Sequence, residues 1–347
     1  MSETLQGQTG IDARRVTAWL QENIAGAEAP FTFRLITGGR SNLTFEVLDA
    51  NGRKMVLRRP PLGEILPSAH DMRREHRIIS ALEPTSVPVP ETLGLCADPD
   101  VNGGAFYVMS FAAGAILRDE AEVEATFAPE RRTAVADSLI DSLCDLHLVD
   151  PDTVGLGDLS KREDYIGRQL RRWNRQYEAS NPRDIPEVAE AHRLLAERVP
   201  EQQRLAIVHG DYRLDNTVVA PDTSIEAVLD WELCTLGDPL ADLGLLLVYW
   251  LQPGEDGSFM LTGTPTVCPG FPDRDHLVAR YGERSGADLS GIDYYVAFGC
   301  WKLACIAEGI LARYTAGVMG DDSVSLERLA GTTPLLARMA LERLERG

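Results

Sequence analysis

The stretch IVHGDYRLDNTVV, residues 207–219, places a histidine, two aspartates and an asparagine between two apolar, strand-like runs. Turns are rich in Asp and Asn, so an ordinary surface turn is one interpretation. The other is a catalytic loop whose oxygen atoms hold a proton and a metal ion. The residues that follow the loop favour the second interpretation.

A third oxygen-bearing side chain follows the loop. A proline turn leads into SIEAVLDWE, whose strand-like segment reaches Asp230. We expect three short strands, over 205–208, 217–220 and 225–230. They would bring Asp211, Asn216 and Asp230 to one edge of a small sheet. Such oxygens suit Mg²⁺, which takes one or two carboxylates plus phosphate oxygens. Phosphoryl transfer needs such a metal, and also an acid that orients the attacking hydroxyl.

Composition limits the class of protein. The chain has 347 residues, enough for two lobes with a sizeable core. Its 34 Lys and Arg against 53 Asp and Glu leave a net charge of −19. A nucleic-acid surface needs clustered basic residues, so we expect no nucleic-acid partner. The acidity suits a cationic substrate, or serves solubility alone.

Cysteine spacing and hydropathy indicate a cytoplasmic protein. The six cysteines form no C-x-x-C pair and several lie in apolar segments, so we expect buried, reduced thiols. The first residues lack a basic-then-apolar signal pattern. The longest apolar run, over 243–251, is short for a membrane span, and we expect no membrane partner. The sequence does not indicate an oligomeric state.

The pattern of apolar residues predicts an α+β protein with two lobes. Residues 1–30 form a helical extension, and 31–111 form a small β-rich N-lobe with one helix from about Ser68 to Leu82. Residues 112–347 form a larger, mainly helical C-lobe, because apolar residues recur there at helical spacing.

The motifs HGDYRLDN and VLDWE together resemble the catalytic and metal-binding signature of the aminoglycoside phosphotransferases and related small-molecule kinases. These enzymes are similar in fold to protein kinases, and the resemblance covers about residues 30–345. It implies that Asp211 is the catalytic base, and that Asn216 and Asp230 are magnesium ligands.

The resemblance also implies two supporting residues. His209 would be a structural residue of the loop. Asp242, in GDPLADLG, would brace the loop by accepting its backbone N–H bonds. Asp238 in the same segment would cap the next helix.

A phosphate-covering loop is expected at TGGRSNLTFEV, residues 37–47. Its glycines permit close approach of the backbone, whose N–H groups can contact phosphate oxygens. The segment matches neither common glycine-rich phosphate motif, and a tight hairpin is the alternative. The expected nucleotide contacts are Gly38, Gly39, Arg40, Ser41 and Asn42.

The segment FYVMSFAAG, residues 106–114, resembles the connection between the lobes of these kinases. Met109 would line the adenine pocket, and the backbone of Ser110 and Ala112 would meet the adenine edge. A buried edge strand is the alternative.

Arg58 and Glu75 are expected to form an ion pair. Glu75 lies on the apolar stripe of its helix, where an unpaired carboxylate would be costly. The pair would correspond to the strand lysine and helix glutamate of kinases, but here arginine replaces the usual lysine. Arginine can bind phosphate bidentately, although its planar fork is not a point charge. The alternative is an ordinary salt bridge that stabilises the lobe.

The phosphate acceptor is expected against two helical segments, RQLRRWNRQY and WKLACIAEGILARY. The candidate contacts are Arg168, Arg172, Trp173, Trp301, Glu308 and Arg313. The second segment also contains Lys302. Solvated helix faces are the alternative for these charges.

The sequence thus predicts a phosphotransferase that uses Mg²⁺ and ATP, or alternatively GTP, to phosphorylate a hydroxyl of a small molecule. The segments VLRRPPLGEILPSAHDMRREHRII and RQLRRW resemble the kinase-like domains fused to acyl-CoA dehydrogenases. This resemblance implies a hydroxy-acid or hydroxyacyl-CoA acceptor rather than an antibiotic. A nucleotide-binding pseudokinase is the other alternative, suggested by Arg58.

Overall fold

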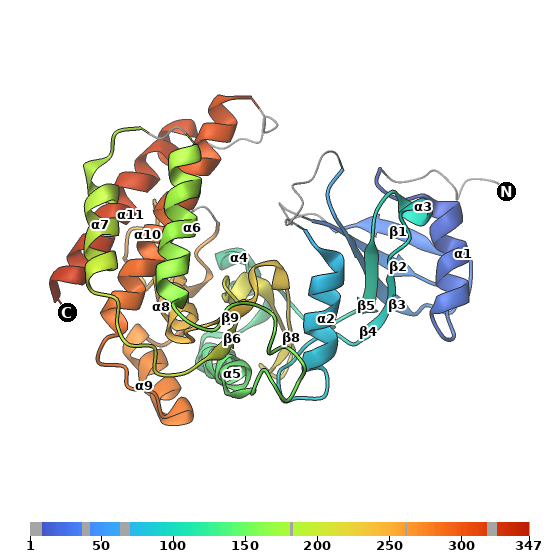
Figure 1. Cartoon of the computed structure of the whole chain (residues 1–347). Helices are drawn as coiled ribbons and strands as arrows, with labels where there is room; N and C mark the ends of the chain where they lie inside the picture. Colours follow the sequence, from blue (N-terminus) through green and yellow to red (C-terminus); the bar gives the residue numbers. More distant parts are fainter. Residues whose placement is uncertain are drawn as a thin grey trace. The chain divides into compact units, whose positions relative to one another are not determined.

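The computed structural model describes residues 9–36, 42–62, 70–180, 183–260, 262–317 and 325–346. The chain divides into two compact units. The first comprises Met1–Ala113 and Glu226–Glu232, and the second comprises Gly114–Ile225 and Leu233–Gly347. A small antiparallel sheet fills the first unit and helices dominate the second (Figure 1), which confirms the predicted α+β class. The limits predicted for the N-lobe and C-lobe stay predictions. The structure adds that the segment with Asp230 belongs to the first unit.

The first unit contains a five-stranded antiparallel sheet of order β1-β2-β3-β5-β4. Its strands are β1 (Thr32–Leu35), β2 (Leu43–Leu48), β3 (Lys54–Arg59), β4 (Thr92–Cys96) and β5 (Phe106–Ser110). A tight turn joins β2 to β3, where the Asp49 carboxylate accepts the N–H groups of Asn51 and Arg53. Gly52 in this turn has φ +82°, which glycine adopts without strain.

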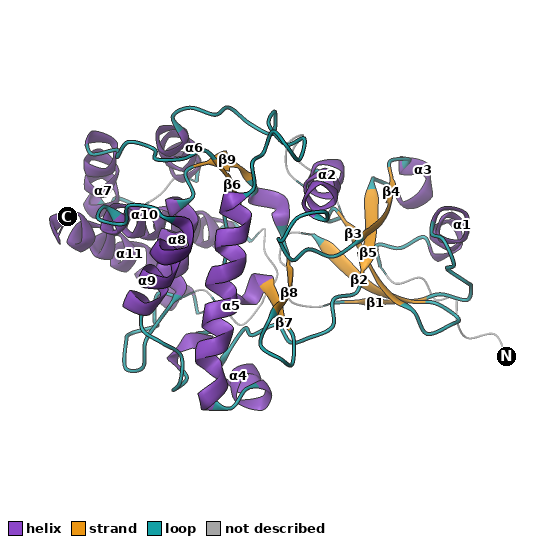
Figure 2. Cartoon of the chain, turned by 90° about the horizontal axis from the view of Figure 1, so that it is seen from below, coloured by secondary structure: helices purple, strands orange, loops and turns teal. Residues whose placement is uncertain are grey.

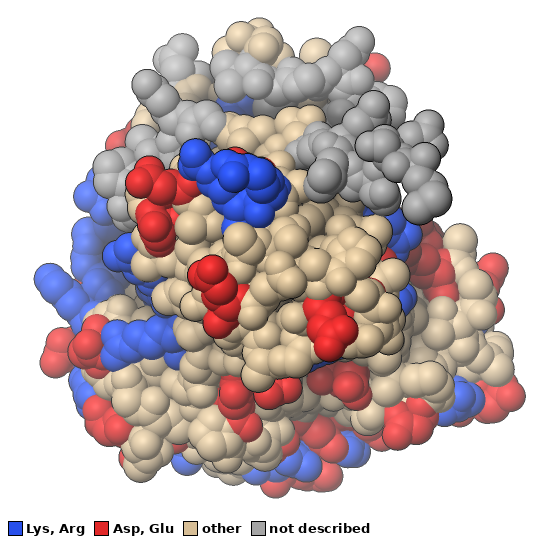
Figure 3. Space-filling model, turned by 90° about the vertical axis from the view of Figure 1, so that its right-hand side faces the viewer, with Lys and Arg blue, Asp and Glu red and all other residues tan. Residues whose placement is uncertain are grey.

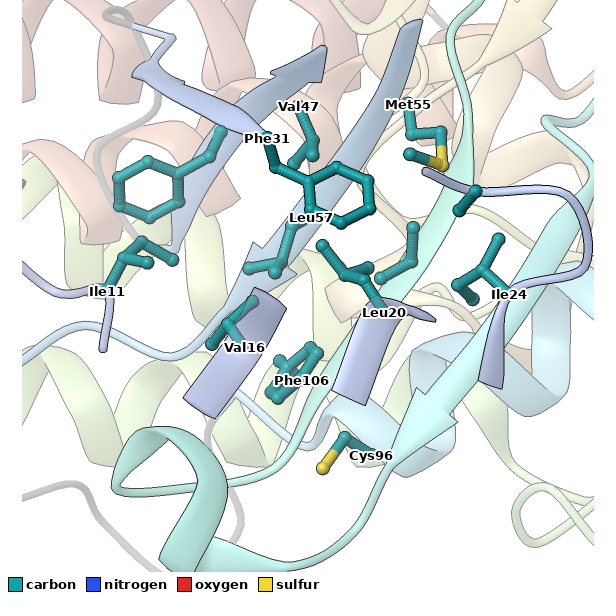
Figure 4. Close-up of a cluster of buried hydrophobic side chains, with 13 residues drawn as sticks. Ile11, Val16, Leu20, Ile24, Phe31, Val47, Met55, Leu57, Cys96 and Phe106 are labelled. Carbon is teal, nitrogen blue, oxygen red and sulfur yellow. The ribbon is translucent and has the colours of Figure 1, made fainter. Parts of the chain in front are cut away.

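Helix α1 (Ala13–Asn23) completes the core of the first unit. Val16 and Leu20 on α1 pack with Leu57 of β3 and Phe106 of β5, and all four are buried (Figure 4). Successive strand residues face opposite sides of a sheet, so the residues that flank Leu57 point away from α1. The predicted N-terminal extension therefore supplies part of the core.

Helix α2 (Met72–Leu82) covers the other face of the sheet and contacts β4 and β5. The helix begins at Met72, because the carboxylate of Asp71 caps it by accepting the N–H groups of Arg73 and Arg74. The predicted cap, Ser68, lies outside the described residues. A short helix, α3 (Pro99–Asn102), connects β4 to β5.

The second unit is mainly helical. Its helices are α4 (Glu120–Thr126), α5 (Pro129–Leu148), α6 (Tyr165–Ala179), α7 (Pro186–Glu197), α8 (Leu240–Tyr249), α9 (Arg274–Ser285), α10 (Ile292–Thr315) and α11 (Leu326–Arg346). Helix α10 lies against α6, α7, α8 and α11 (Figure 2). It is therefore the central helix of this unit.

Short strands carry the motif loop. They are β6 (Ala206–Val208), β7 (Thr217–Val219), β8 (Ile225–Val228) and β9 (Thr235–Gly237). β6 pairs antiparallel with β9, a strand that the sequence analysis did not predict. β8 ends at Val228, so the prediction that this strand reaches Asp230 was wrong. Asp230 instead has φ +64°, a conformation that ends a strand.

Two predictions from composition have different outcomes. The six cysteines are free and buried, as predicted. The apolar segments were expected to be too short to span a membrane, and this was wrong: judged by length and composition alone, one helix is long and apolar enough. Helix α10 passes that test, but 78% of its apolar window is buried inside the structure, as in a core helix.

On the face in Figure 3, basic and acidic side chains are interspersed among the residues drawn.

Candidate active site

The motif loop of the second unit begins where β6 ends and continues through a 3₁₀ turn, Leu214–Asn216, into β7. Gly210 has φ +86°, and a Cβ atom there would lie 2.8 Å from the carbonyl oxygen of Leu233. Glycine is therefore required at this position. The sharp bend after Gly210 places Asp211 in the loop rather than in the strand.

Asp242, on α8, holds the start of this loop. Its two carboxylate oxygens accept the backbone N–H groups of His209 (2.7 Å) and Gly210 (2.8 Å). His147 lies 3.2 Å from Asp242 through Nε2, and its Nδ1 lies 2.8 Å from the hydroxyl of Tyr281. Burial alone would raise the pKa of Asp242, but the His147 and backbone contacts hold that pKa below its ordinary value. The geometry matches the bracing role that the resemblance implies.

Asp211 is oriented by its neighbours in the loop. Its N–H donates to Nδ1 of His209 at 3.2 Å. Asn216 Nδ2 donates to the Asp211 carbonyl at 2.8 Å and to Oδ2 at 3.0 Å, and Arg213 Nε lies 3.3 Å from the same Oδ2. These side-chain contacts are all to Oδ2, so Asn216 and Arg213 together hold one oxygen of the Asp211 carboxylate.

Arg213 links two carboxylates. Besides Asp211 it contacts Asp215 Oδ2 at 3.0 Å, and its guanidinium lies 4.9 Å from the centre of the Tyr249 ring. Burial raises the pKa of Asp215 to about 6, although Arg213 opposes the shift. Neither Arg213 nor Asp215 was predicted to have a role, although both lie inside the motif HGDYRLDN.

The first unit contains a second cluster of charges around Arg58. The predicted ion pair is present, with Nε of Arg58 3.0 Å from Oε2 of Glu75. Arg58 Nη2 also contacts the Asp230 carboxylate. Glu75 is 1% exposed and accepts from the Tyr107 hydroxyl at 3.1 Å and from Asn42 Nδ2 at 3.2 Å. One guanidinium therefore serves two carboxylates.

The electrostatics of this cluster follow from its burial. Burial lowers the pKa of Arg58, but Asp230 and Glu75 outweigh that effect and raise it overall. Burial raises the pKa of Glu75 and Arg58 lowers it, with a net rise. The guanidinium of Arg58 therefore stays charged. Its positive charge is what favours the ionised form of the buried Glu75 carboxylate.

Glu232 and Tyr107 are members of this cluster that the sequence analysis missed. Asn42 Nδ2 lies 3.2 Å from Glu232 Oε2, and His70 Nδ1 lies 3.6 Å from the same oxygen. Asn42, predicted to contact nucleotide, thus bridges the carboxylates of Glu75 and Glu232. Glu232 is the last residue of the motif VLDWE, and its place beside Asp230 was the signal in the sequence that could have identified it. The other predicted loop contacts, Gly38, Gly39, Arg40 and Ser41, lie outside the described residues.

The oxygen donors of the site suit magnesium. Asn216 donates both its hydrogen bonds through Nδ2, which leaves its amide oxygen for a cation. Asp230, the other predicted ligand, lies in the first unit, where its carboxylate contacts Arg58. Within the described ranges, no three His, Cys, Asp or Glu residues form a metal cluster. Few protein ligands are the usual case for Mg²⁺ bound with phosphates. That Asp211, Asn216 and Asp230 converge stays a prediction.

The residues predicted to meet adenine lie at the end of β5. Met109 is buried and pairs with Val56 of β3. The Ser110 N–H donates to the Glu91 carbonyl at 2.8 Å, and Ser110 pairs with Met55 of β3. Ala112 is half-buried just beyond the strand.

Two predicted acceptor contacts are interior residues. Trp301 has no exposed surface; it stacks on His192 and donates from Nε1 to the Val188 carbonyl at 3.1 Å. Glu308 is 3% exposed, and Arg183 contacts it from Nε at 2.9 Å and from Nη2 at 2.7 Å. The prediction was wrong for Trp301, because it has no exposed surface to offer an acceptor. The Glu308 carboxylate is held by the exposed Arg183, and its contact with an acceptor stays a prediction.

Of the remaining acceptor candidates, Trp173 is buried and the three arginines are more accessible. Arg168 is half-buried and donates to the Lys161 carbonyl at 2.7 Å. Arg172 is exposed and its guanidinium lies 5.4 Å from the centre of the Trp173 ring, while Arg313 is exposed on α10. Their contact with an acceptor stays a prediction.

Comparison with known sequences identifies relatives of the chain. The family model described as the phosphotransferase enzyme family matches residues 32–284. Mouse acyl-CoA dehydrogenase family member 10 is 36% identical over 289 residues, which cover 80% of this chain and 26% of that protein. Rat acyl-CoA dehydrogenase family member 11 is 33% identical over 348 residues, 96% of this chain and 43% of that protein. The chain thus spans less than half the length of these relatives.

Solved structures show the same fold. A candidate aminoglycoside phosphotransferase from Ralstonia eutropha matches with a TM-score of 0.81 and 32% identity, covering 96% of this chain and 98% of that chain. An aminoglycoside phosphotransferase in a ternary complex with AMP-PNP and hygromycin B matches with a TM-score of 0.59 and 18% identity. That match covers 93% of this chain and 98% of the other, and shows a likeness of fold.

Proposed function

Because the chain belongs to the phosphotransferase enzyme family, we propose that it is a kinase that transfers the γ-phosphoryl group of ATP to a hydroxyl of a small molecule. The acceptor oxygen forms a bond to the γ-phosphorus, the bond from that phosphorus to the β–γ bridging oxygen breaks, and ADP leaves. The hydroxyl proton passes to Asp211. The observation that carries this proposal is the orientation of Asp211, whose Oδ2 is held by Asn216 and Arg213.

Magnesium is the proposed metal. Asn216 and Asp230 would hold it, and it would neutralise charge on the phosphates when bound. ATP is the proposed nucleotide and GTP the alternative. Arg58 would contact the phosphates, since its guanidinium already serves anionic oxygens in this cluster.

The proposed acceptor is a hydroxy acid or a hydroxyacyl thioester. Two of the relatives above 30% identity, from mouse and rat, are named as acyl-CoA dehydrogenase family members. Two cationic side chains lie near Asp211: Arg213 contacts its carboxylate, and Lys302 of α10 donates to the carbonyl of the preceding residue, Gly210. An aminoglycoside carries ammonium groups and would be repelled there, whereas a carboxylate or a polarised carbonyl would be attracted.

The test is a phosphorylation screen with labelled ATP over hydroxy acids, hydroxyacyl thioesters and aminoglycosides, with and without Mg²⁺. We expect Mg²⁺-dependent product from the first two classes. Asp211→Asn should lower kcat by about 10²- to 10⁴-fold while nucleotide binding by calorimetry is retained.

The matched control is Asp222→Asn, an exposed aspartate in the turn that follows β7, which should leave kcat unchanged. Full activity of Asp211→Asn would overturn the assignment of the base. Nucleotide binding without turnover on any acceptor would favour the pseudokinase alternative.

A further inference from the structure

Lys302 is a buried cation in the middle of α10. It is 8% exposed, and its neighbours Trp301 and Leu303 are buried apolar residues. A buried ammonium is costly unless it is well paired. Here the close contact is a neutral one, because Nζ donates to the backbone carbonyl of Gly210 at 2.6 Å. Stability alone does not explain a lysine at this position.

The contact completes a clamp on one residue of the motif loop. The Gly210 N–H donates to Asp242 Oδ1 at 2.8 Å, and the Gly210 carbonyl accepts from Lys302 at 2.6 Å. Two buried side chains of opposite charge, one from α8 and one from α10, therefore hold Gly210 at both ends. The next residue is Asp211. The orientation of the Gly210 carbonyl determines the direction in which the chain enters Asp211.

The surroundings of Lys302 hold its ammonium in place. Nζ lies 5.4 Å from the centre of the Trp173 ring, within the range of a cation–π interaction. Burial lowers the pKa of Lys302, and the carboxylates of Asp211 and Asp242 oppose that shift. The negative charges of Asp211, in the loop, and of Asp242, which holds the loop, thus favour the charged form of Lys302.

We propose that Lys302 is a positioning residue, which orients Asp211 toward the acceptor by fixing the carbonyl of Gly210. The proposal rests on the proposed role of Asp211 and adds a residue to it. A methionine has a similar shape without the charge, so replacing Lys302 by methionine removes the clamp and the cost of a buried ammonium together. A stabilising role and a positioning role then predict opposite results.

The experiment compares Lys302→Met with a control on the same helix, Cys305→Ala, which removes a buried side chain away from the clamp. Lys302→Met should melt no lower than wild type and should leave the KM for ATP unchanged. Its kcat should fall by about 10- to 100-fold, because misplacing a catalytic group by about 1 Å has an effect of that size. Lys302→Arg keeps a cationic donor and should recover part of the lost kcat. Cys305→Ala should melt lower and keep its kcat.

Amide hydrogen exchange gives a second readout that needs no acceptor. Lys302→Met should exchange faster over residues 207–216 only, whereas Cys305→Ala should not affect this segment. Unchanged kcat and unchanged exchange in Lys302→Met would overturn the proposal. So would a Lys302→Met protein that unfolds, or that exchanges faster throughout the second unit, because Lys302 would then be structural. A wild-type protein without turnover would refute the proposed function, while exchange over 207–216 would still report on the clamp.

Discussion

The two units bury charge in different ways. In the first unit, Arg58 lies between the carboxylates of Glu75 and Asp230, so side chains pair with side chains. In the second, the Asp242 carboxylate pairs with backbone N–H groups at the start of the motif loop. A side-chain ion pair can exchange partners when a ligand competes, whereas a contact to the backbone fixes the path of the chain. The first arrangement suits ligand binding and the second suits positioning.

The difference has a consequence for Asp230. This carboxylate is the proposed magnesium ligand, and in the structure Arg58 occupies it. Magnesium bound there would therefore compete with Arg58 for this carboxylate, and Glu75 would be the residue that retains Arg58. Changes in the first cluster should affect metal-nucleotide affinity, and changes at Asp242 should affect turnover and folding.

The largest effect is expected for Asp242→Asn. An amide can accept one of the two backbone N–H groups but presents its own NH₂ to the other. Removing one partner of a buried charged network costs about 3–5 kcal/mol in the free energy of unfolding. We also expect kcat to fall by at least about 10²-fold, because the loop that carries Asp211 is no longer held. Urea denaturation and steady-state kinetics measure the two effects.

The pH dependence of this variant has a defined sign. Because the pKa of Asp242 is lowered in the folded protein, its carboxylate stabilises the fold above the unfolded pKa of about 4. This contribution is lost as the pH falls through the lower, folded pKa. The difference in stability between wild type and Asp242→Asn should therefore be full at neutral pH and shrink below about pH 4.

Asp238→Asn is the matched control. Asp238 is also buried near the start of α8, where it accepts from the Tyr295 hydroxyl at 2.7 Å and the Leu240 N–H at 3.1 Å. Burial raises the pKa of Asp238, so the fold does not favour its charged form. This variant should lose less stability than Asp242→Asn and should keep its kcat. Equal losses of kcat in the two variants would contradict the role given to Asp242.

A smaller effect is expected for Glu75→Gln in the first unit. The neutral amide of the variant no longer attracts Arg58 as strongly, so Arg58 interacts mainly with Asp230. Magnesium should then compete less well for the Asp230 carboxylate. We expect the Kd for Mg²⁺·ATP to rise by about 5- to 20-fold, since a buried charged hydrogen bond contributes roughly 1.5–3 kcal/mol and part of it is retained by the amide. Calorimetry of ATP binding at several Mg²⁺ concentrations measures this, and ATP binding without Mg²⁺ should change little.

Glu46→Gln controls for a glutamate on the same sheet. Glu46 on β2 lies 3.2 Å from Arg34 and 3.6 Å from Lys54, two exposed partners that do not belong to the Arg58 cluster. Its replacement should leave the Mg²⁺ dependence of ATP binding unchanged. The explanation fails if Glu75→Gln weakens ATP binding equally with and without Mg²⁺, because the effect would then not involve competition for Asp230.

Much of this arrangement could be predicted from the sequence, because the decisive groups lie close together in the chain. The loop at 207–219 and its flanking strands follow from a polar motif between apolar runs. The pair of Arg58 with Glu75 was predictable because a carboxylate on an apolar helix stripe needs a cation. The α+β class followed from the change in periodicity near residue 114.

The remaining features depend on contacts that no local pattern specifies. The acceptor segment around α10 was interpreted by residue type, so Trp301 was predicted at the site although it is interior. Lys302, one residue later, points to the Gly210 carbonyl, 92 positions away in sequence. A single lysine in an apolar run was the signal, but its partner depends on how α10 packs in the second unit. For the same reason the sequence did not predict β9, the partner of β6.

The smallest effect on stability is expected for an ion pair between side chains at the surface. Comparing it with the Arg58 cluster separates the influence of burial from that of ion pairing. Arg284 on α9 contacts Asp145 at 2.8 Å and Asp141 at 3.5 Å on α5. Its side chain is 39% exposed, so water and salt screen these pairs. Arg284→Ala should lower the free energy of unfolding by no more than about 1 kcal/mol, and the loss should disappear near 1 M salt.

Glu75→Gln should change Mg²⁺·ATP affinity by a factor that salt alters little, because that cluster is buried. If salt abolished both effects equally, burial would not distinguish the Arg58 cluster from an exposed ion pair, and the contrast between the two kinds of site would not hold.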